Sequence, residues 1–537
     1  MIRGTVTLRN YRCFDWDNPM RLEFCDGFVA LIGPNNSGKS SALRAIYELR
    51  PLFQNIFPSF SSVNGFRHHP GFQFVSDPSE LANDGDPNRF QVSVDLPTQP
   101  SGVSPEHIVV RHLTVEFRIR ENCFVPIRVV AEHPRQGKFA VDERNVKDVA
   151  GLAGEYLVNY VDRGVADFRD ISAFCVELAN SRYYPAFRNA INEGAGVYYD
   201  IPVGTSLVGT WNGWKAGNAR AQKLAIAKVE AEIASLLGFR TLQINADQSD
   251  KTLDVIINNR PHKLYEVGAG VAQLIITFAA ALVSKPPYIL IDEPELNLHP
   301  SLQLQFLTAL ASYAQHGVIY ATHSIGLARS TTSRIYCISK QPDGPARIQP
   351  FGEHSPNFSE WLGELSYSSR LDIGCEGIIL VEGPSEVLCF QEFLRKLGKD
   401  HEYVLIQLGG SSLINDRSAQ HLAEITRLVE PRRVHVFVDS ERDSEGATVT
   451  PDRQAFMANA RSLGFHATAS DRRATENYFP RSAIQRAFGP EFDALTPFQR
   501  LKDAPRPWPK ANNFKIAREM QAEDLNGTDL GQFLAQL

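Results

Sequence analysis

Hydrophobic and polar positions alternate between strand-like and helix-like spacing in the first 50 residues. The runs TVTLRN, RLEF and FVALIG are short and β-rich, whereas SSALRAIYEL carries apolar residues at helical spacing. Farther along, RFQVSVDL and HLTVEFRI alternate in the manner of antiparallel strands. The pattern predicts an α/β unit decorated by antiparallel strands.

Between about residues 150 and 239 the pattern becomes helical. The segment ARAQKLAIAKVEAEIASLLGF places apolar residues three and four positions apart, with charges between them. This spacing is typical of an inserted helical arm. Two roles stay open for it, namely dimerisation and packing on its own domain.

Later apolar runs predict buried parallel strands. PPYILIDEP and GVIYATHS each end in polar residues. A second α/β region begins near Gly374 with GIILVEGPSE, followed by VLIQLGG and VHVFVDSE. We therefore expect two α/β domains, residues 1–350 and 374–537, which also suits a length of 537 residues.

Composition places the chain among folded proteins, with 43% hydrophobic and 22% charged residues. The N-terminal run lacks the features of a signal peptide and no apolar stretch is long enough to span a bilayer, so we expect a cytoplasmic location without a membrane partner. Seven scattered cysteines without a CxxC pair indicate neither a zinc site nor a disulfide framework. Because the net charge is -6, contact with nucleic acid requires a local basic surface.

The segment GPNNSGKS, residues 33–40, matches the phosphate-binding loop pattern between a predicted strand and a predicted helix. Its glycines would let backbone N–H groups close around phosphates, Lys39 would neutralise their charge, and Ser40 would ligate magnesium. An ordinary glycine-rich turn is the alternative interpretation. The residues predicted to bind ATP here are Gly33, Asn36, Gly38, Lys39, Ser40 and Ser41.

Two acids, Asp292 and Glu293, follow the apolar run YILI, at the strand end where open α/β sheets bind ligands. Beside a phosphate loop, Asp292 is expected to hold magnesium and Glu293 to polarise the attacking water. An acidic pair after a strand is also common as a helix cap. A third strand ends in the segment ATHS, where His323 is predicted to report on the γ-phosphate.

In this order, the phosphate loop, the run DEPELNLHP at residues 292–300 and the THS segment resemble the ABC-type ATPases of the SMC, RecF and OLD group. The resemblance implies that a signature segment with Gly268 and Gly270 completes the ATP site of a second subunit, and hence at least a homodimer. Ala269 stands where relatives carry serine, which would weaken that contact. A helix-opening glycine pair is the alternative interpretation of this segment.

Acidic residues also follow the strands of the C-terminal region. Glu382 ends the run IILV and Glu386 follows one helical turn later, while Asp439 and Glu441 end the run VHVFV. Acids at adjacent strand ends repel one another unless a cation compensates, and oxygen ligands suit Mg²⁺ or Mn²⁺. The pattern predicts a divalent-metal site for phosphodiester hydrolysis, with Asp443 as the alternative to Glu441.

The order Glu-Gly, then Gly409-Gly410, then Asp-x-acid resembles the Toprim fold, and the run RRATENY at residues 472–478 resembles a run of OLD-family nucleases. The resemblance implies that Glu476 is another metal ligand and that a later helix carries an active-site lysine. We expect this lysine at Lys515, with Lys510 as the competing candidate. The predicted metal ligands are Glu382, Glu386, Asp439, Glu441 and Glu476, and the predicted catalytic residues are Glu293, His323 and Lys515.

Both halves together resemble the OLD (overcoming lysogenization defect) family, including Gabija-type and retron-associated nucleases. The resemblance implies an ATP-regulated, Mg²⁺-dependent DNA endonuclease or nickase in defence against phage, acting as a homo-oligomer and often with a second defence protein or an RNA–DNA element. A Toprim RNase, a sensor ATPase that binds nucleic acid or a partner without cutting, and a RecF-type repair ATPase are the alternatives. The C-terminal carboxylates argue against the last two.

Overall fold

A computed structural model describes most of the chain as two compact units. The described residues are 2–34, 36–55, 78–97, 107–120, 123–133, 137–142, 149–154, 157–160, 164–186, 195–247, 249, 251–332, 334–340, 344–351, 376–400, 402–408, 422 and 430–537. The first unit contains Met1–Asn297, Tyr313–His323 and Tyr336–Phe351, and the second contains Leu298–Ser312, Ser324–Ile335 and Gly352–Leu537. The predicted domain boundary, between residues 350 and 374, falls largely outside the described residues.

A six-stranded sheet forms the centre of the first unit, in the order β12-β18-β19-β3-β20-β21. The neighbours β12, β18, β19 and β3 are parallel, and every residue of β3, β18 and β19 is buried. Burial on both faces explains why these strands are continuous apolar runs. The bounds are β3 (Gly27–Ile32), β12 (Arg182–Tyr184), β18 (Tyr288–Asp292), β19 (Gly317–Thr322), β20 (Ile335–Lys340) and β21 (Ala346–Pro350).

An antiparallel sheet in the order β2-β1-β4-β6-β7-β8 shares its core with the central sheet. Phe24 of β2 packs edge to face on Phe174 and on Tyr288, with ring centroids 5.9 and 5.0 Å apart, so one aromatic cluster joins the two sheets. The bounds are β1 (Ile2–Arg9), β2 (Met20–Cys25), β4 (Arg89–Asp95), β6 (His112–Arg120), β7 (Cys123–His133) and β8 (Gly137–Asp142), with the helices α1 (Lys39–Glu48), α2 (Arg50–Asn55) and α4 (Arg169–Asn180).

The prediction of a helical segment over about residues 150–239 was wrong for its first part. Three strands, β9 (Val149–Gly154), β10 (Leu157–Tyr160) and β11 (Gly164–Asp167), join β5 (His107–Val109) in a four-stranded sheet. These strands are only four to six residues long, and β11 pairs with β5, which is distant in sequence, so their strand character depends on context more than on local pattern. In addition, β12 extends the central sheet.

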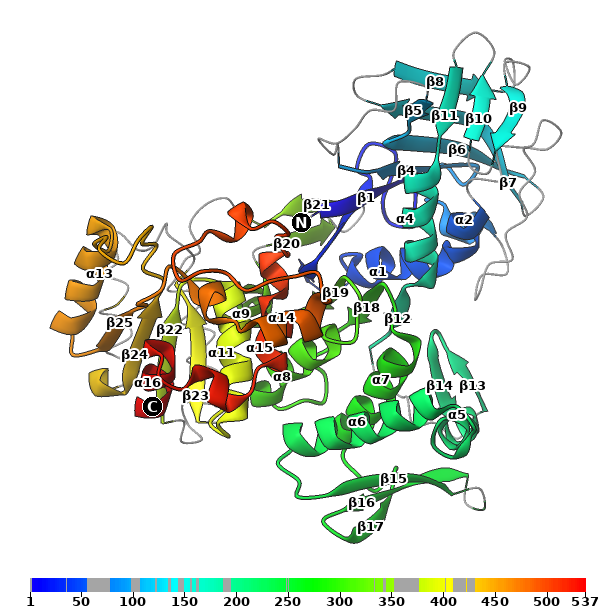
Figure 1. Cartoon of the computed structure of the whole chain (residues 1–537). Helices are drawn as coiled ribbons and strands as arrows, with labels where there is room; N and C mark the ends of the chain where they lie inside the picture. Colours follow the sequence, from blue (N-terminus) through cyan, green and yellow to red (C-terminus); the bar gives the residue numbers. More distant parts are fainter. Residues whose placement is uncertain are drawn as a thin grey trace. The chain divides into compact units, whose positions relative to one another are not determined.

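The helices predicted in that segment are α5 (Thr205–Ala216) and α6 (Arg220–Leu236) (Figure 1). They pack on each other and on β15, and α6 also packs on α7. The remaining elements here are β13 (Ala195–Tyr198), β14 (Ile201–Gly204), β15 (Leu242–Asp247), β16 (Thr252–Ile257), β17 (Arg260–Lys263) and α7 (Ala269–Ser284). None of the helices that the structure describes has the length and apolar character needed to cross a lipid bilayer.

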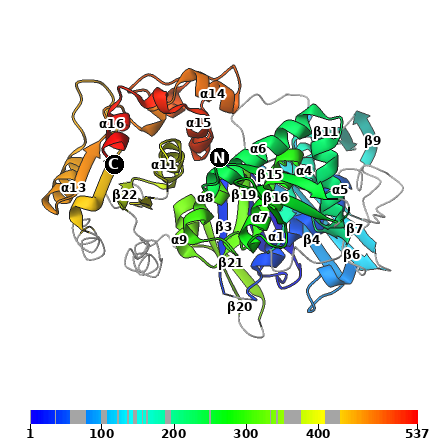
Figure 2. The same cartoon turned by 90° about the horizontal axis from the view of Figure 1, so that it is seen from below.

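A parallel sheet in the order β23-β22-β24-β25 forms the centre of the second unit. Figure 2 shows α11 beside α15, and α11 also packs on β23 and α9. The strands are β22 (Gly377–Val381), β23 (Tyr403–Gln407), β24 (Val434–Val438) and β25 (His466–Ala469). The helices are α8 (Pro300–Ala311), α9 (Ile325–Thr331), α11 (Pro384–Lys396), α13 (Pro451–Ser462), α14 (Arg481–Phe488), α15 (Asn513–Glu519) and α16 (Asp529–Gln536).

Two helices of the second unit follow strands of the first unit directly in the sequence. α8 comes after β18, and α9 comes after β19. Gln305 of α8 donates a 2.9 Å hydrogen bond to Asp400, and Gln407 of β23 donates to the carbonyl oxygen of Arg329 in α9. The helices α8 and α9, which follow strands of the central sheet in the chain, are therefore packed within the second unit. The Gly409-Gly410 pair lies outside the described residues.

Candidate functional site

The loop between β3 and α1 closes tightly at two glycines. Gly33 and Gly38 have φ angles of +154° and +109°, a region that side chains rarely adopt. A Cβ at Gly33 would lie 2.1 Å from the carbonyl oxygen of Ile338, and one at Gly38 would lie 2.7 Å from the sulfur of Cys13. Both positions of the predicted phosphate loop therefore require glycine.

Lys39 begins α1 and turns back across this loop. Its buried Nζ donates hydrogen bonds to the carbonyl oxygens of Gly33 and Pro34, at 2.8 and 2.9 Å. Burial lowers the pKa of Lys39, while the negative charges of Asp292 and Glu293 oppose that shift. The Lys39 ammonium group lies at the N-terminus of a helix and within a backbone loop, and this arrangement is suited to binding a phosphate group.

Asp292 ends β18 beside the phosphate loop, as predicted. Burial raises the pKa of this carboxyl group, and a hydrogen bond from Ser40 opposes the rise. Its Oδ1 atom is buried and has no hydrogen-bond partner in the described part of the chain. The Ser40 hydroxyl and the Asp292 carboxylate are oxygen ligands of the kind that magnesium prefers, so together they fit the magnesium ion that accompanies ATP.

Glu293 and His323, from the ends of adjacent strands, lie together. The Nε2 atom of His323 is 3.4 Å from Oε1 of Glu293. Glu295 holds the end of β19 in place, since its Oε1 accepts hydrogen bonds from the hydroxyl of Thr322 at 2.6 Å and from the backbone N–H of His323 at 2.9 Å. The sequence-based reasoning missed Glu295, although it lies inside the DEPE run.

The remaining predicted nucleotide residues occupy helix starts and turns. Asn36 has a φ angle of +62°, and Ser41 lies on the first turn of α1, where its carbonyl oxygen accepts from Tyr11. Gly268 caps the N-terminus of α7 and is exposed, and Gly270 is half-buried. A side chain at Gly268 would meet open space, so this glycine is not required by packing.

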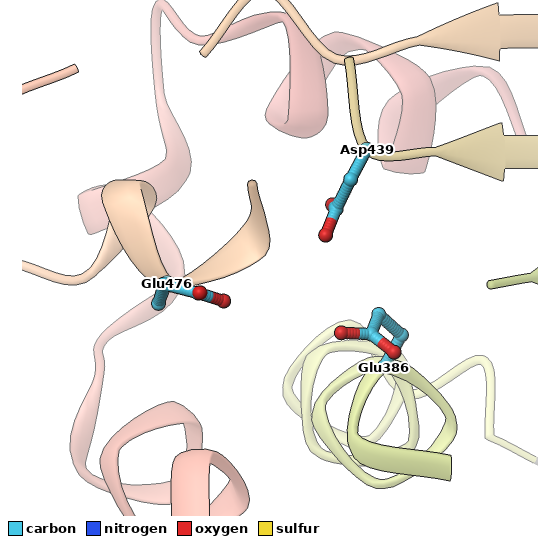
Figure 3. A group of neighbouring side chains, drawn as sticks. All are labelled: Glu386, Asp439 and Glu476. Carbon is cyan, nitrogen blue, oxygen red and sulfur yellow. The ribbon is translucent and has the colours of Figure 1, made fainter. Parts of the chain in front are cut away.

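Three carboxylates meet in the second unit. Glu386 lies on the first turn of α11, Asp439 directly follows β24, and Glu476 lies in the short helix η5 (Thr475–Tyr478). One oxygen atom from each lies within 4.8 Å of the others, and all three residues are buried. Figure 3 shows their side chains converging. We call this group the acidic centre.

Positive charge and hydrogen bonds hold the acidic centre. Lys510 Nζ lies 3.1 Å from Glu386 Oε1 and 3.8 Å from Glu476 Oε2. Asp439 Oδ1 accepts hydrogen bonds from the backbone N–H and the hydroxyl of Thr475, at 3.0 and 3.1 Å. Asn513 Nδ2 donates a longer bond to Glu476, at 3.5 Å.

Burial, opposed or reinforced by neighbouring charges, shifts the pKa values in the acidic centre. Burial and then the charge of Glu386 raise the pKa of Asp439, and burial raises the pKa of Glu476 against the attraction of Lys510. Burial by itself lowers the pKa of Lys510, but Glu386, Glu476 and Asp439 outweigh it, so the pKa is raised. Carboxylates in this position stay ionised together only when a cation compensates.

The other two predicted metal ligands have arginine partners. Glu382 Oε1 accepts a 2.7 Å hydrogen bond from Arg453, while its Oε2 is buried without a hydrogen-bond partner among the described residues. Burial raises the pKa of Glu382, with Glu386 adding to the effect. Glu441 contacts Arg473 and is not among the three converging carboxylates. The sequence-based reasoning had no signal for these arginine partners, which are 71 and 32 residues away.

The lysine that contacts the acidic centre is Lys510, in the short helix η7 (Lys510–Asn512) just before α15. Lys515 lies within α15 and is half-buried. The Trp508 indole braces this segment by donating a 2.8 Å hydrogen bond to Asn513. The structure thus brings the competing candidate, rather than Lys515, against Glu386 and Glu476.

Asp443, the alternative to Glu441, contacts Arg473 and lies 3.0 Å from Arg500. Arg500 belongs to a segment at residues 496–510 that we call the basic loop. Asn477 anchors this loop by donating to the carbonyl oxygens of Thr496 and Gln499, at 2.7 and 2.9 Å. The loop ends at Lys510 and exposes Arg500, Lys502 and Arg506. It is a local basic surface bordering the acidic centre.

Comparisons with known proteins concern mainly the first unit. Residues 28–329 match the family model described as "AAA domain, putative AbiEii toxin, Type IV TA system". A stretch of 112 residues is 30% identical to the glutamine transport ATP-binding protein GlnQ of Escherichia coli (strain K12), covering 20% of this chain and 47% of that protein. A stretch of 123 residues is 26% identical to the peptidoglycan transport ATP-binding protein YejF of Agrobacterium fabrum, covering 21% and 22%. The matches span less than half the length of these curated relatives.

Among solved structures, similarity extends to heads of SMC proteins. A SmcHead bound to the C-winged helix domain of ScpA has 13% sequence identity and a TM-score of 0.38, covering 66% of this chain and 98% of that one. The SMC head domain from Thermotoga maritima has 14% identity and a TM-score of 0.31, covering 66% and 100%.

The range of the family model includes the phosphate loop, Asp292, Glu293 and His323, the residues that the structure brings to one edge of the central sheet. The first unit therefore has the α/β fold of an ABC-type P-loop ATPase. Since the match spans more than half of the chain, the protein belongs to the family of AAA domains described as putative AbiEii toxins of type IV toxin–antitoxin systems.

Proposed function

We propose that this ATPase controls a divalent-metal-dependent nuclease of OLD type in its second unit, and that the nuclease cuts DNA. The observation that carries the proposal is the acidic centre, in which three buried carboxylates converge beside Lys510. A role in bacterial defence against phage is supported by the family description, which names a toxin of a toxin–antitoxin system.

The acidic centre fits a Mg²⁺ or Mn²⁺ ion because all of its candidate ligands are oxygen atoms. Glu386, Asp439 and Glu476 would hold the ion. When bound, it would stabilise charge on a phosphodiester and lower the pKa of a water molecule. Buried carboxylates with raised pKa values, as at Asp439 and Glu476, are the environment that a cation stabilises.

The chain's own residues then position and stabilise the substrate. Lys510 offers its ammonium to the negative charge that builds up on the scissile phosphate. Thr475 fixes the direction of the Asp439 carboxylate through two hydrogen bonds. Arg500, Lys502 and Arg506 of the basic loop bind the sugar–phosphate backbone, which supplies the local attraction that a chain of net charge -6 needs.

In the first unit, Lys39 and the N-terminus of α1 bind the phosphates of ATP, and Ser40 with Asp292 holds its magnesium. Glu293 orients the attacking water, with His323 beside it. In the signature segment Gly268 is exposed and Gly270 half-buried, and the exposure of Gly268 to a second copy supports a homodimer. The helices α8 and α9 follow these ATPase segments in the chain and belong to the second unit. Through them, a change at the nucleotide site would be transmitted to the nuclease.

Nicking of supercoiled plasmid tests the proposal. Purified protein with Mg²⁺ or Mn²⁺, with and without ATP, is compared with Glu386→Gln and with the control Glu430→Gln, an exposed residue at the opposite end of β24. We expect nicking that disappears in Glu386→Gln and persists in Glu430→Gln. Lys39→Ala is expected to change only the response to ATP.

Other results of the nicking experiment would indicate a different active site, a different substrate or a different function. Equal nicking by wild type and Glu386→Gln would show that the acidic centre is not the active site. Cleavage of transfer RNA without cleavage of DNA would move the substrate class to RNA. ATP hydrolysis with neither DNA nor RNA cleaved would favour a sensor ATPase.

A further inference from the structure

A cavity of about 820 Å³ lies in the first unit, at the far ends of two helices that begin at nucleotide-binding segments. Tyr47 lies at the end of α1, which begins at Lys39, and Arg50 begins α2 just beyond. Ser284 ends α7, which begins after Gly268. The cavity is therefore separate from the phosphate loop but is connected to it and to the signature segment by single helices.

Aromatic rings provide much of its wall. Tyr47 and Tyr199 contact each other edge to face, with centroids 5.2 Å apart, and Tyr184 and Trp214 also line the space. Arg50 stacks over the Tyr47 ring at 4.8 Å. Flat, weakly polar walls of this kind suit a planar ring that stacks between them.

The polar groups of the cavity offer donors rather than acceptors. Asp200 already accepts from Arg50 at 3.0 and 2.7 Å, from Arg182 at 3.1 Å and from the backbone N–H of Tyr183 at 2.8 Å. Both of its oxygen atoms are thus occupied. Two guanidinium groups face a single carboxylate, so the lining carries an excess of positive charge.

The Tyr184 hydroxyl is buried and interacts with the Ser284 hydroxyl beside it. Nε of Arg50 is buried and has no hydrogen-bond partner in the part of the chain that the structure describes. The neighbouring Ser284 hydroxyl donates to the carbonyl oxygen of Ala280 at 2.6 Å. Because buried polar groups are nearly always paired, Arg50 Nε is one donor at the cavity that still lacks an acceptor among the described residues.

We propose that this cavity binds a free mononucleotide as an effector of the ATPase. The base stacks on Tyr199 and Trp214, and the phosphate lies at Arg182, whose side chain is 39% exposed. A planar heterocycle that carries negative charge matches both the aromatic rings and the excess of positive charge in the lining. The proposal is independent of the nuclease function.

Such a ligand would contact the ends of both α1 and α7. Its binding would therefore favour one arrangement of the helix that carries Lys39 and the helix that follows the signature glycines. By thermodynamic reciprocity, occupancy of the cavity and occupancy of the phosphate loop would change each other's affinity.

Calorimetric titration tests the binding. The probes are AMP, GMP, CMP and UMP, which lack the β- and γ-phosphates, added to full-length protein carrying Lys39→Ala so that the phosphate loop is disabled. In this background we compare Trp214→Ala, Arg182→Ala and, as the matched control, Arg21→Ala, an exposed arginine of β2. We expect binding of at least one nucleotide, weakened about tenfold or more by Trp214→Ala, since stacking is worth about 1–3 kcal/mol per base.

Trp214→Phe, which keeps a ring, is expected to restore most of the affinity, and circular dichroism checks that each variant folds. The effector role predicts that the bound nucleotide changes the ATP hydrolysis rate of wild type but not of Trp214→Ala. Absence of binding, affinity unchanged in both Trp214→Ala and Arg182→Ala, binding of a single-stranded oligonucleotide in place of the mononucleotides, or an unchanged hydrolysis rate would each overturn it.

Discussion

The ammonium group of Lys510 lies 3.1 Å from Glu386 Oε1, among carboxylates that come from three separate segments. One ammonium does not neutralise three ionised carboxylates, and the charge that remains corresponds to one divalent cation. The arrangement therefore combines a fixed cation from the chain with a place for an exchangeable one.

Lys510→Ala is expected to lower the cleavage rate by about 100-fold or more, the usual effect of removing one group that stabilises transition-state charge. Lys515→Ala provides a matched control on the same segment and should stay within about tenfold of wild type, since its side chain is not the one that contacts Glu386. Single-turnover plasmid nicking measures both. A larger loss in Lys515→Ala than in Lys510→Ala would contradict the assignment.

Asp439→Asn and Glu441→Gln should differ in their effect on metal binding, although the two acids are neighbours in sequence. Asp439 converges with Glu386 and Glu476, whereas Glu441 contacts Arg473. We expect Asp439→Asn to weaken Mn²⁺ binding by at least about 10-fold, with a smaller effect of Glu441→Gln. Paramagnetic resonance of free Mn²⁺ gives both affinities, and equal losses would show that Glu441 is a ligand.

Glu293→Gln is expected to slow ATP hydrolysis by about 100-fold or more while ATP still binds, because it removes the group that orients the attacking water. Glu295→Gln should give a smaller loss in the same direction, since Glu295 positions the backbone of His323 and the side chain of Thr322. Phosphate release and nucleotide binding are measured separately, with Glu23→Gln on β2 as the control. A hydrolysis rate unchanged in Glu293→Gln would rule out its proposed role.

The basic loop should control DNA affinity rather than the chemical step. Lys502→Glu and Arg506→Glu are expected to weaken DNA binding and to reduce its salt dependence by about one unit of slope for each lost phosphate contact. Cleavage at saturating DNA should stay near the wild-type rate. Arg432→Glu, an exposed change at the opposite end of β24, is the control. If it weakens binding as much, the loop is not the specific surface.

His435 should make the second unit less stable in acid. Burial and the neighbouring His466 lower the pKa of His435 to about 4, from an ordinary 6.5. The unfolded chain therefore binds more protons in this window, so the stabilisation is complete above pH 6.5 and is lost as the pH falls toward 4.

His435→Phe provides the comparison, because it keeps an aromatic ring against Tyr403 and Phe533 and removes the titrating group. Thermal unfolding followed by circular dichroism between pH 7 and pH 4 measures the difference. Wild type should lose more stability than the variant over this range. Parallel losses in the two proteins would assign the acid sensitivity to other groups.

Local patterns were sufficient for the central strands and the phosphate loop. FVALI, YILID and VIYAT are continuous apolar runs because both faces of each strand are buried, so the sequence reports the environment directly. The phosphate loop could be predicted from Gly33 and Gly38 for a similar reason, since the backbone angles and close contacts at those positions admit only glycine. In each case the physical constraint acts on a few consecutive residues.

Partners far apart in sequence decided the rest. Asp439 and Glu441 look equivalent along the chain, but Arg473 engages only the second, and Lys510 rather than Lys515 reaches Glu386 because of where the segment before α15 packs. Among the strands at residues 149–167, β11 likewise pairs with the distant β5. The sequence by itself determined which chemical groups were present and which strands were buried, whereas the tertiary structure determined which charges face one another, because electrostatic pairing depends on distances between segments that no local pattern encodes.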